Sequence, residues 1–238
     1  MKKSLLAAGA GLMLALALPA SAAPIILNNG NFSSGFAGWT LAAPGGSSTT
    51  FSGPGTLGPP ITSGAQLTND SGLSQAAGEA DLGLTAGSLT PFGRLATQGG
   101  TTTGTVLYQS ITSGLVGDTI SFKGVFNAED VNLYDFGAAS LAGSGSAQQL
   151  QLIGAGDGSV HTLALFTFTL TQNATALNPL IFGFASYNTL DSGILSSISV
   201  SQQQQPVPEI DPHTAALPVA FALGSLLLLA DRRKRQAT

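Results

Sequence analysis

The sequence predicts an all-β protein, with one antiparallel β-sandwich between two short apolar terminal segments. Apolar and polar residues alternate with a period near two in its central part, and no long 3.6-residue stripe competes with that pattern. Gly, Asn, Asp and Pro interrupt these runs at short intervals, as turns between strands do. Ser and Thr are abundant and charged residues make up only 8% of the chain, a composition typical of exported β-rich proteins.

The N-terminal segment has the parts of a secretory signal peptide. Lys2 and Lys3 begin it, residues 5–18 are apolar, and Ala20 and Ala22 occupy the small-residue positions of an A-x-A cleavage site. The apolar run is shorter than the ~20 residues of a bilayer span, so we favour a signal peptide over an uncleaved anchor. We expect signal peptidase to cut after Ala22.

The central part predicts five clear strands and two long surface loops. Phe166 and Phe168 share one face of a strand whose other face carries threonines, as a half-buried antiparallel strand requires. The expected strands cover residues 105–111, 119–126, 163–171, 180–187 and 194–200. Segments 42–64 and 96–104 are rich in Pro, Gly, Ser and Thr, which predicts loops outside the core.

The C-terminal segment predicts a membrane helix with a fixed orientation. Residues 214–230 are apolar and just long enough to cross a thin bilayer. Arg232, Arg233, Lys234 and Arg235 follow them, and the positive-inside rule keeps such a cluster cytoplasmic. A simple C-terminal anchor is the alternative. The expected organisation is signal peptide 1–22, sandwich 23–201, linker and motif 202–213, membrane helix 214–230 and basic cytoplasmic tail 231–238.

Charge and cysteine content exclude several function classes. Residues 24–208 hold nine carboxylates against Arg94 and Lys123, a net charge of −7 that disfavours nucleic-acid binding. The chain has no cysteine, so disulfides, thiolate zinc sites and cysteine nucleophiles are excluded. We expect no cofactor.

The C-terminal pattern resembles a known sorting signal. Val207, Pro208, Glu209, Ile210 and Asp211 precede the apolar run and the basic end, an order similar to that of PEP-CTERM proteins of Gram-negative bacteria in their VPEID variant. The resemblance covers about the last 32 residues. It implies processing by an exosortase, a membrane-embedded transpeptidase, after transient anchoring in the inner membrane, and delivery to the cell surface or outside the cell.

The start of the domain resembles galactose-binding-like jelly-roll domains. Residues 27–39 contain Asn29-Gly30 for a tight turn, with Phe32 and Trp39 expected between the sheets. Residues 107–136 are similar to a domain common in exported PEP-CTERM proteins. That family often holds a structural calcium, but Ser33 and Ser196-Ser197 stand where its acidic ligands would be, so we expect no such site here.

Acidic residues supply the remaining candidates for chemistry. Glu129, Asp130 and Asp135 form the densest cluster and are weak candidates for a calcium site, although their spacing matches no known loop and a solvated connection is the favoured interpretation. Glu79 and Asp81 would share a face of a strand as a glycosidase pair does, but without evident burial to shift a pKa we favour a non-catalytic role.

Other residues suggest chemistry only weakly. His161 has no G-x-S-x-G elbow to pair with. Residues 154–158 are glycine-rich but lack a P-loop lysine, so a hairpin turn is expected. Tyr108, Tyr134 and Tyr187 would suit either a sugar-stacking surface or the edge of an ordinary core.

Two functions remain open. The first is a structural or adhesive surface protein, for example in a biofilm matrix, with exosortase and signal peptidase as processing partners. The second is a carbohydrate-binding module with exopolysaccharide as a partner, which is an analogy at the level of fold. We expect a protein that is not an enzyme.

Overall fold

The computed structural model describes residues 22–42, 45–53, 55–57, 61–93, 103–127, 135–143, 148–155, 163–188 and 197–202. The expected signal peptide before Ala22, the sorting motif, the apolar segment 214–230 and the basic tail lie outside these residues. Among the helices that are described, none has the length and apolar character needed to cross a bilayer. The structure therefore concerns the central domain.

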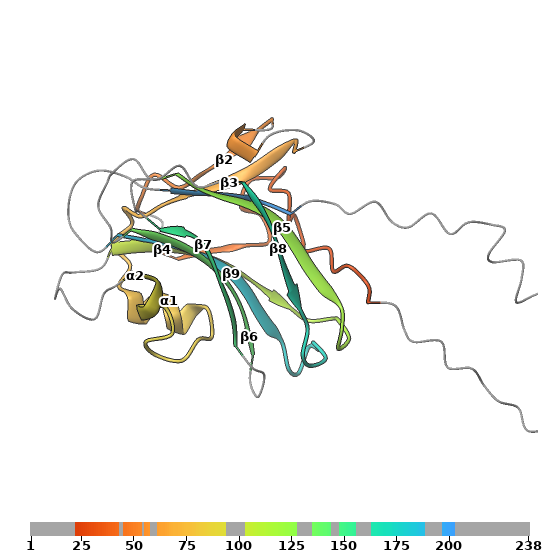
Figure 1. Ribbon diagram of the computed structural model, residues 1–238. Helices are drawn as coiled ribbons and strands as arrows, with labels where there is room; N and C mark the ends of the chain where they lie inside the picture. Colours follow the sequence, from red (N-terminus) through yellow and green to blue (C-terminus); the bar gives the residue numbers. More distant parts are fainter. Residues whose placement is uncertain are drawn as a thin grey trace, which may run out of the picture. The chain divides into compact units, whose positions relative to one another are not determined.

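The described residues form ten strands in two antiparallel five-stranded sheets (Figure 1). The predicted β-sandwich is confirmed. The first sheet has the order β1 (Thr40–Ala42), β4 (Thr103–Ile111), β9 (Leu180–Asn188), β6 (Phe136–Gly143), β7 (Gln149–Ala155). The second sheet has the order β2 (Thr49–Ser52), β3 (Ser63–Thr68), β10 (Ser197–Ser201), β5 (Thr119–Asn127), β8 (Ala164–Thr169).

The strand order is that of a jelly roll. From β3 onward the chain passes between the sheets at each connection except the β6–β7 hairpin, so that β4-β9-β6-β7 faces β3-β10-β5-β8. Strands β1 and β2 each add a short edge strand to one sheet. The five strands expected from alternation correspond to β4, β5, β8, β9 and β10, although β10 is described only from Ser197.

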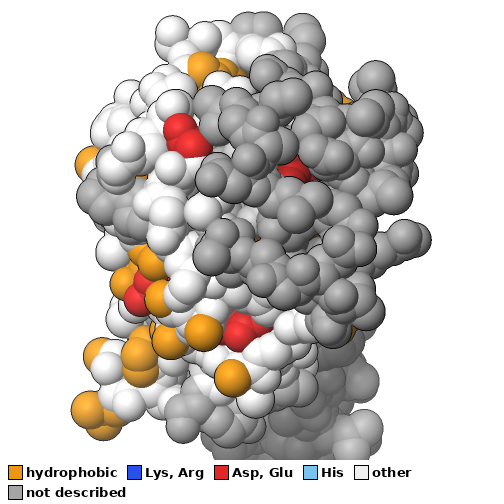
Figure 2. Space-filling view, turned by 90° about the vertical axis from the view of Figure 1, so that its left-hand side faces the viewer, with side chains coloured by type: hydrophobic (Ala, Val, Ile, Leu, Met, Phe, Trp, Pro, Cys, Tyr) orange, Lys and Arg blue, Asp and Glu red, His pale blue; other side chains and the backbone are white. Residues whose placement is uncertain are grey.

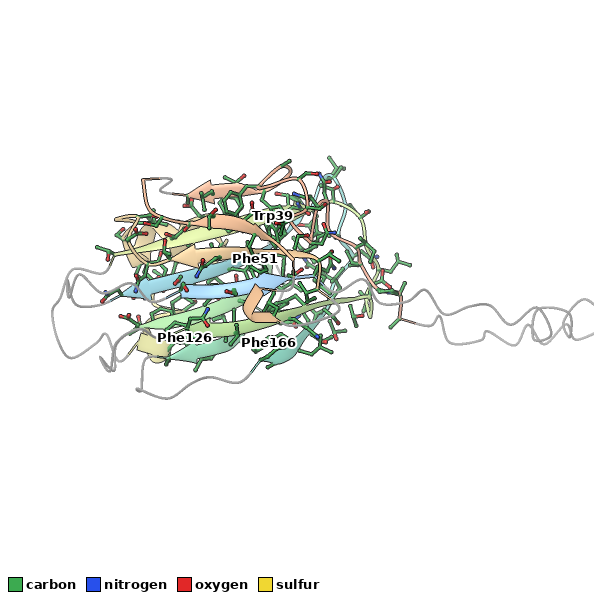
Figure 3. The ribbon with its side chains drawn as sticks, turned by 90° about the horizontal axis from the view of Figure 1, so that it is seen from above. Trp39, Phe51, Phe126 and Phe166 are labelled. Carbon is green, nitrogen blue, oxygen red and sulfur yellow. The ribbon has the colours of Figure 1, made fainter. Side chains whose placement is uncertain are left out.

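Aromatic side chains fill the space between the sheets. Phe122 and Phe184 meet edge to face with ring centroids 4.9 Å apart, so strands β5 and β9 are joined across the core. Phe32 and Trp39 enter from the N-terminal segment, with ring centroids 5.0 Å apart, and Trp39 stacks on Phe184. Figure 3 labels Trp39 among the side chains of the sandwich. The expected place of Phe32 and Trp39 in the core is confirmed.

Glutamine side chains join the edge strands on one side of the sandwich. Gln149 and Gln151 of β7 donate from Nε2 to the carbonyl oxygens of Thr169 and Thr167 in β8, at 2.6 and 2.7 Å. These carbonyls point away from the partner strand β5, and an edge strand with unpaired carbonyls is a template for aggregation. The glutamines therefore protect one edge of each sheet.

Two short helices cover the outer face of the first sheet. Helix α1 (Gln75–Asp81) begins at Ser74, whose side chain accepts a hydrogen bond from the N–H of Ala77, and helix α2 (Thr90–Gly93) follows. Leu82, Leu84 and Leu89 pack on apolar side chains of β4, β6 and β9. The expectation of a strand at Glu79 and Asp81 is wrong. The segment has helical spacing, so the two carboxylates lie on different sides of α1.

Two further expectations need correction. The segment 42–64 contains β2 and a 3₁₀ turn (Gly55–Leu57), and Leu57 is fully buried beside Val125 on the outer face of the second sheet, where Phe51 also packs. The many small polar residues of this segment favoured a surface loop, and the burial of Leu57 was therefore not predicted. Within residues 154–158, Gly154 and Ala155 belong to strand β7, and residues 156–158 lie outside the described part.

The sandwich has two distinct ends. One, here called the Asp70 end, holds the last residues of β3, β5 and β9 and the first residues of β4, β6 and β10. The other, here called the Asp118 end, holds residues 22–39, the connections 112–118 and 170–179, and Gln202. Both described ends of the domain therefore lie at the Asp118 end.

Candidate functional site at the Asp70 end

Polar side chains from several strands meet at the Asp70 end. Asn69 and Asp70 follow β3, Thr103 begins β4, and Asp135 directly precedes β6. Figure 2 looks onto this end, where acidic side chains are visible and no Lys or Arg side chain of the described residues is. A jelly roll brings these segments together because its strands end in pairs at the same rim.

Asp70 is held by the segment before β2. Its two carboxylate oxygens accept hydrogen bonds from the N–H of Ser47, both at 3.0 Å, and from the Ser47 hydroxyl at 2.6 Å. The Thr68 hydroxyl donates a further bond of 2.6 Å. Partial burial acts to raise the pKa of Asp70, but the hydrogen bonds from Ser47 and Thr68 outweigh it and hold the pKa below its usual value. Asp70 is therefore a fixed negative charge at neutral pH.

Asn69 links β3 to β6 beneath this charge. Its side chain is 1% exposed and donates from Nδ2 to Oδ2 of Asp135 at 3.1 Å. The backbone carbonyl oxygen of Asn69 accepts a hydrogen bond from the Thr103 hydroxyl. Oδ1 of Asn69 is buried and has no hydrogen-bond partner among the described residues. Buried polar atoms in native proteins are nearly always paired, so the unpaired Oδ1 of Asn69 beside the buried Asp135 carboxylate is unusual. It marks this cluster as a candidate functional site.

The sequence found only part of this cluster. Asp135 lies in it, 3% exposed, whereas Glu129 and Asp130 lie outside the described residues. Within the described part, no group of three Asp, Glu, His or Cys side chains is close enough to hold a metal ion. Asn69 and Asp70 were missed, because the run Asn69-Asp70-Ser71-Gly72 is typical of an ordinary turn and gives no sign of a buried side chain.

The glycosidase pair is not supported by the geometry. Glu79 is 2% exposed and its two carboxylate oxygens accept hydrogen bonds from the N–H groups of Gly87 and Leu89, at 2.7 and 2.8 Å. It thereby closes the turn between α1 and α2. Because its lone pairs are used inside the fold, Glu79 organises the cover of the first sheet and faces no cleft.

The described tyrosines do not form an exposed stacking platform. Tyr187 is fully buried under α1, and its hydroxyl donates to the carbonyl oxygen of Ser74 at 3.2 Å. Burial, with the negative charges of Glu79 and Asp81, raises its pKa far above the usual value. Tyr108 is half-buried against the same cover. Tyr134 and His161 lie outside the described residues.

A small pocket lies at the opposite end. It has a volume of about 210 Å³ and lies between residues 25–28 and residues 109–113. Gln109 beside it is occupied structurally, because its side chain donates to the carbonyl oxygens of Asn28 and Gly38 and accepts from the N–H of Asn28. The pocket is therefore a gap beside a junction whose polar groups are already hydrogen-bonded.

No family model and no curated protein matches this sequence. Solved structures with a similar arrangement of strands include TmCBM61 in complex with β-1,4-galactotriose, at 9% identity and a TM-score of 0.42, covering 74% of this chain and 93% of that one. A family 16 carbohydrate-binding module has 14% identity and a TM-score of 0.36, with 75% and 96% covered. The K3 adhesin domain of Lys-gingipain from Porphyromonas gingivalis has 13% identity and a TM-score of 0.34, with 72% and 96% covered.

Proposed function

We propose that this chain is an exported surface or extracellular-matrix protein whose β-sandwich has a structural or adhesive role and no catalytic one. The observation that supports it is that the described chain ends lie at one end of the sandwich, whereas the polar cluster around Asp70 lies at the other. Both described ends of the chain lie at the Asp118 end. We infer that the Asp70 end, where the Asp70 carboxylate is partly exposed, is the end that contacts a partner outside the cell.

The terminal segments support export and sorting in this proposal. The signal peptide directs the chain to the translocation machinery, and the apolar run 214–230 with Arg232–Arg235 stops it in the inner membrane. The motif Val207–Asp211 is then the site of exosortase recognition. Eleven residues, 203–213, separate the described domain from the apolar run, and such a chain extends at most about 40 Å, so the motif stays close to the membrane during processing.

Replacing Pro208 and Glu209 by Ala tests the sorting step. We expect a full-length, membrane-bound precursor to accumulate, because the recognised dipeptide is lost while the membrane helix remains. Fractionated cells analysed by blotting for the domain give the readout, and replacing Gln204 and Gln205 by Ala in the linker is the matched control. Unchanged processing of the Pro208/Glu209 variant would remove exosortase recognition of this motif from the proposal.

Carbohydrate binding at the Asp70 end is the second candidate. Its favouring observation is the partly exposed Asp70 carboxylate, a charged acceptor that suits the hydroxyl donors of a sugar. None of the large apolar side chains that are strongly exposed in the described part is aromatic, so binding at this end would depend on hydrogen bonds more than on ring stacking.

A glycan array probed with the exported protein separates the two candidates. Sugar-specific binding that is weakened at least tenfold by Asp70→Ala and unaffected by Asp81→Ala, a carboxylate of α1, would establish the carbohydrate-binding role. Absence of binding across the array, with the protein still localised at the cell surface, would leave the structural or adhesive role.

A further inference from the structure

Asp118 binds the first residues of the domain. Its Oδ1 accepts a hydrogen bond of 3.0 Å from the backbone nitrogen of Ala23, and its Oδ2 accepts one of 2.8 Å from the N–H of Leu115. The Ala23 carbonyl oxygen in turn accepts from the N–H of Thr119, and the N–H of Ile25 donates to the Thr119 carbonyl oxygen. The Ala23 nitrogen is therefore fixed against a carboxylate by bonds on both sides.

The same nitrogen is the leaving atom of the expected processing reaction. Hydrolysis of the Ala22–Ala23 bond consumes one water: its hydroxyl goes to the carbonyl carbon of Ala22, which becomes a carboxylate, and the nitrogen of Ala23 takes protons to become an ammonium group. Residues 22–24 are exposed, so the bond stands outside the packed domain. A cut one residue later would start the chain at Pro24, whose nitrogen is not the one that Asp118 binds.

We propose that Asp118 is the binding site for the N-terminus that signal peptidase creates, and that cleavage after Ala22 converts a hydrogen bond from a neutral amide to the Asp118 carboxylate into an ion pair. The inference rests on the proposed export of the chain. A positive charge on the donor adds Coulomb attraction to the negative Asp118 carboxylate, so the processed chain holds its first residues more firmly than its precursor does.

Asp118 is hydrogen-bonded to three segments of the Asp118 end, so the ion pair affects more than the N-terminus. Its carbonyl oxygen accepts from the N–H of Leu170, and the N–H of Gly117 donates to the Leu170 carbonyl oxygen. The carboxylate thus ties the start of the domain to the β4–β5 turn, and the backbone ties that turn to the chain after β8. Removal of the signal peptide therefore tightens three segments of the Asp118 end together.

The electrostatic surroundings of the new ammonium group are simple. The segments packed around it are residues 22–39, 112–119 and 170–179 with Gln202, and Asp118 is the one titratable side chain in their sequences. A neighbouring carboxylate raises the pKa of an ammonium group above its usual value of about 7.7–8.0. The stabilisation is then complete below the unfolded pKa and is lost as the pH rises through the higher folded pKa.

The test begins with the N-terminal residue of the exported protein, determined by sequencing and intact mass. The rate of α-amine acetylation is then measured by mass spectrometry between pH 6 and 10, which gives the apparent pKa of the N-terminus. We expect Ala23 as the first residue and an apparent pKa about half a unit higher in the wild type than in Asp118→Asn. Asp81→Asn, which removes an equal charge elsewhere, should match the wild type.

A second measurement avoids dependence on a variant that folds poorly. The urea midpoint of the exported wild type is measured at pH 7 and at pH 10, with and without acetylation of its α-amine. We expect the midpoint of the unacetylated protein to decrease more between the two pH values than that of the acetylated protein. An Ala23 start with equal pKa values in wild type and Asp118→Asn, and no difference on acetylation, would overturn the ion pair and leave export intact. A processed chain that starts elsewhere also overturns it, whereas a cytoplasmic chain that keeps Met1 refutes export itself.

Discussion

Carboxylates in this chain are held mainly by backbone N–H groups and hydroxyls. Asp70 accepts from the N–H of Ser47, Glu79 from those of Gly87 and Leu89, and Asp118 from that of Leu115. Lys123 is the one Lys or Arg in the described part of the chain, so ion pairs are scarce there. Glu79 and Asp118 close local turns, and Asp70 joins two segments 23 residues apart, so these carboxylates are satisfied by N–H and hydroxyl donors without a basic side chain.

Asp70 gives a prediction at the scale of a residue. Asp70→Asn should lower the urea midpoint at pH 7, because the amide replaces one acceptor of the bonds from Ser47 and Thr68. The folded pKa of Asp70 lies below its usual value of 3.8, so its stabilisation is present above pH 3.8 and is lost as the pH falls through the folded pKa. The gap between wild type and variant should therefore shrink from pH 4 to pH 2, measured by urea titration at each pH. A constant gap would contradict this account.

Helix α1 provides a prediction at the scale of an element. Alanine favours a helix over glycine by up to about 1 kcal/mol, but a Cβ at Gly78 would fall against the Tyr187 hydroxyl and Cγ2 of Val106. Overpacking of a filled core costs about 1–3 kcal/mol, so we expect Gly78→Ala to destabilise the domain despite its helix propensity.

A double-mutant cycle measured by urea unfolding identifies the cause. Tyr187→Phe removes the hydroxyl that the new methyl group meets, at the cost of the bond to Ser74. Gly78→Ala should therefore cost less in the Tyr187→Phe background than in the wild type. A Gly78→Ala variant that is more stable than the wild type would show that α1 does not press on the sheet as described.

The elements differ in how far the sequence could predict them. Strands β4, β5, β8 and β9 alternate strongly, so their existence and approximate bounds followed from period alone. Strand β6 could not be found this way, because all but its last residue are buried on both faces and its Gly and Ala side chains leave no alternation. Helix α1 is short and rich in Ala and Gly, and its place is decided by the apolar face of the sheet that it covers.

How far the sequence could predict the candidate site depended on the separation of its residues along the chain. Asn69 and Asp135 are 66 residues apart, and only the crossing of the chain between sheets brings them together. Asp135 could be selected from the sequence because it stood near other carboxylates. Asn69 could not, since an asparagine after a strand is ordinarily a turn residue, and its burial is a property of the whole fold.

At the scale of the molecule, the two ends of the domain are fastened to each other. Gln202 donates from Nε2 to the carbonyl oxygen of Ile25 at 2.7 Å and accepts at Oε1 from the N–H of Leu27 at 2.8 Å. Its own N–H donates to the carbonyl oxygen of Gly30. The sequence predicts a polar linker that begins at Gln202, but the structure makes Gln202 part of the domain, and residues 203–205 lie outside the described part.

This fastening predicts how the isolated domain behaves. A fragment of residues 23–205 should be a soluble monomer with a β-type circular dichroism spectrum, because its core is complete without the terminal segments. Gln202→Ala in that fragment leaves a buried N–H at Leu27 without its acceptor, which costs about 1–3 kcal/mol of the free energy of unfolding. Gln204→Ala is the matched control and should leave the urea midpoint unchanged. Equal stability of the two variants would mean that the chain ends are not joined through Gln202, and a helical or disordered spectrum of the fragment would refute an independent sandwich.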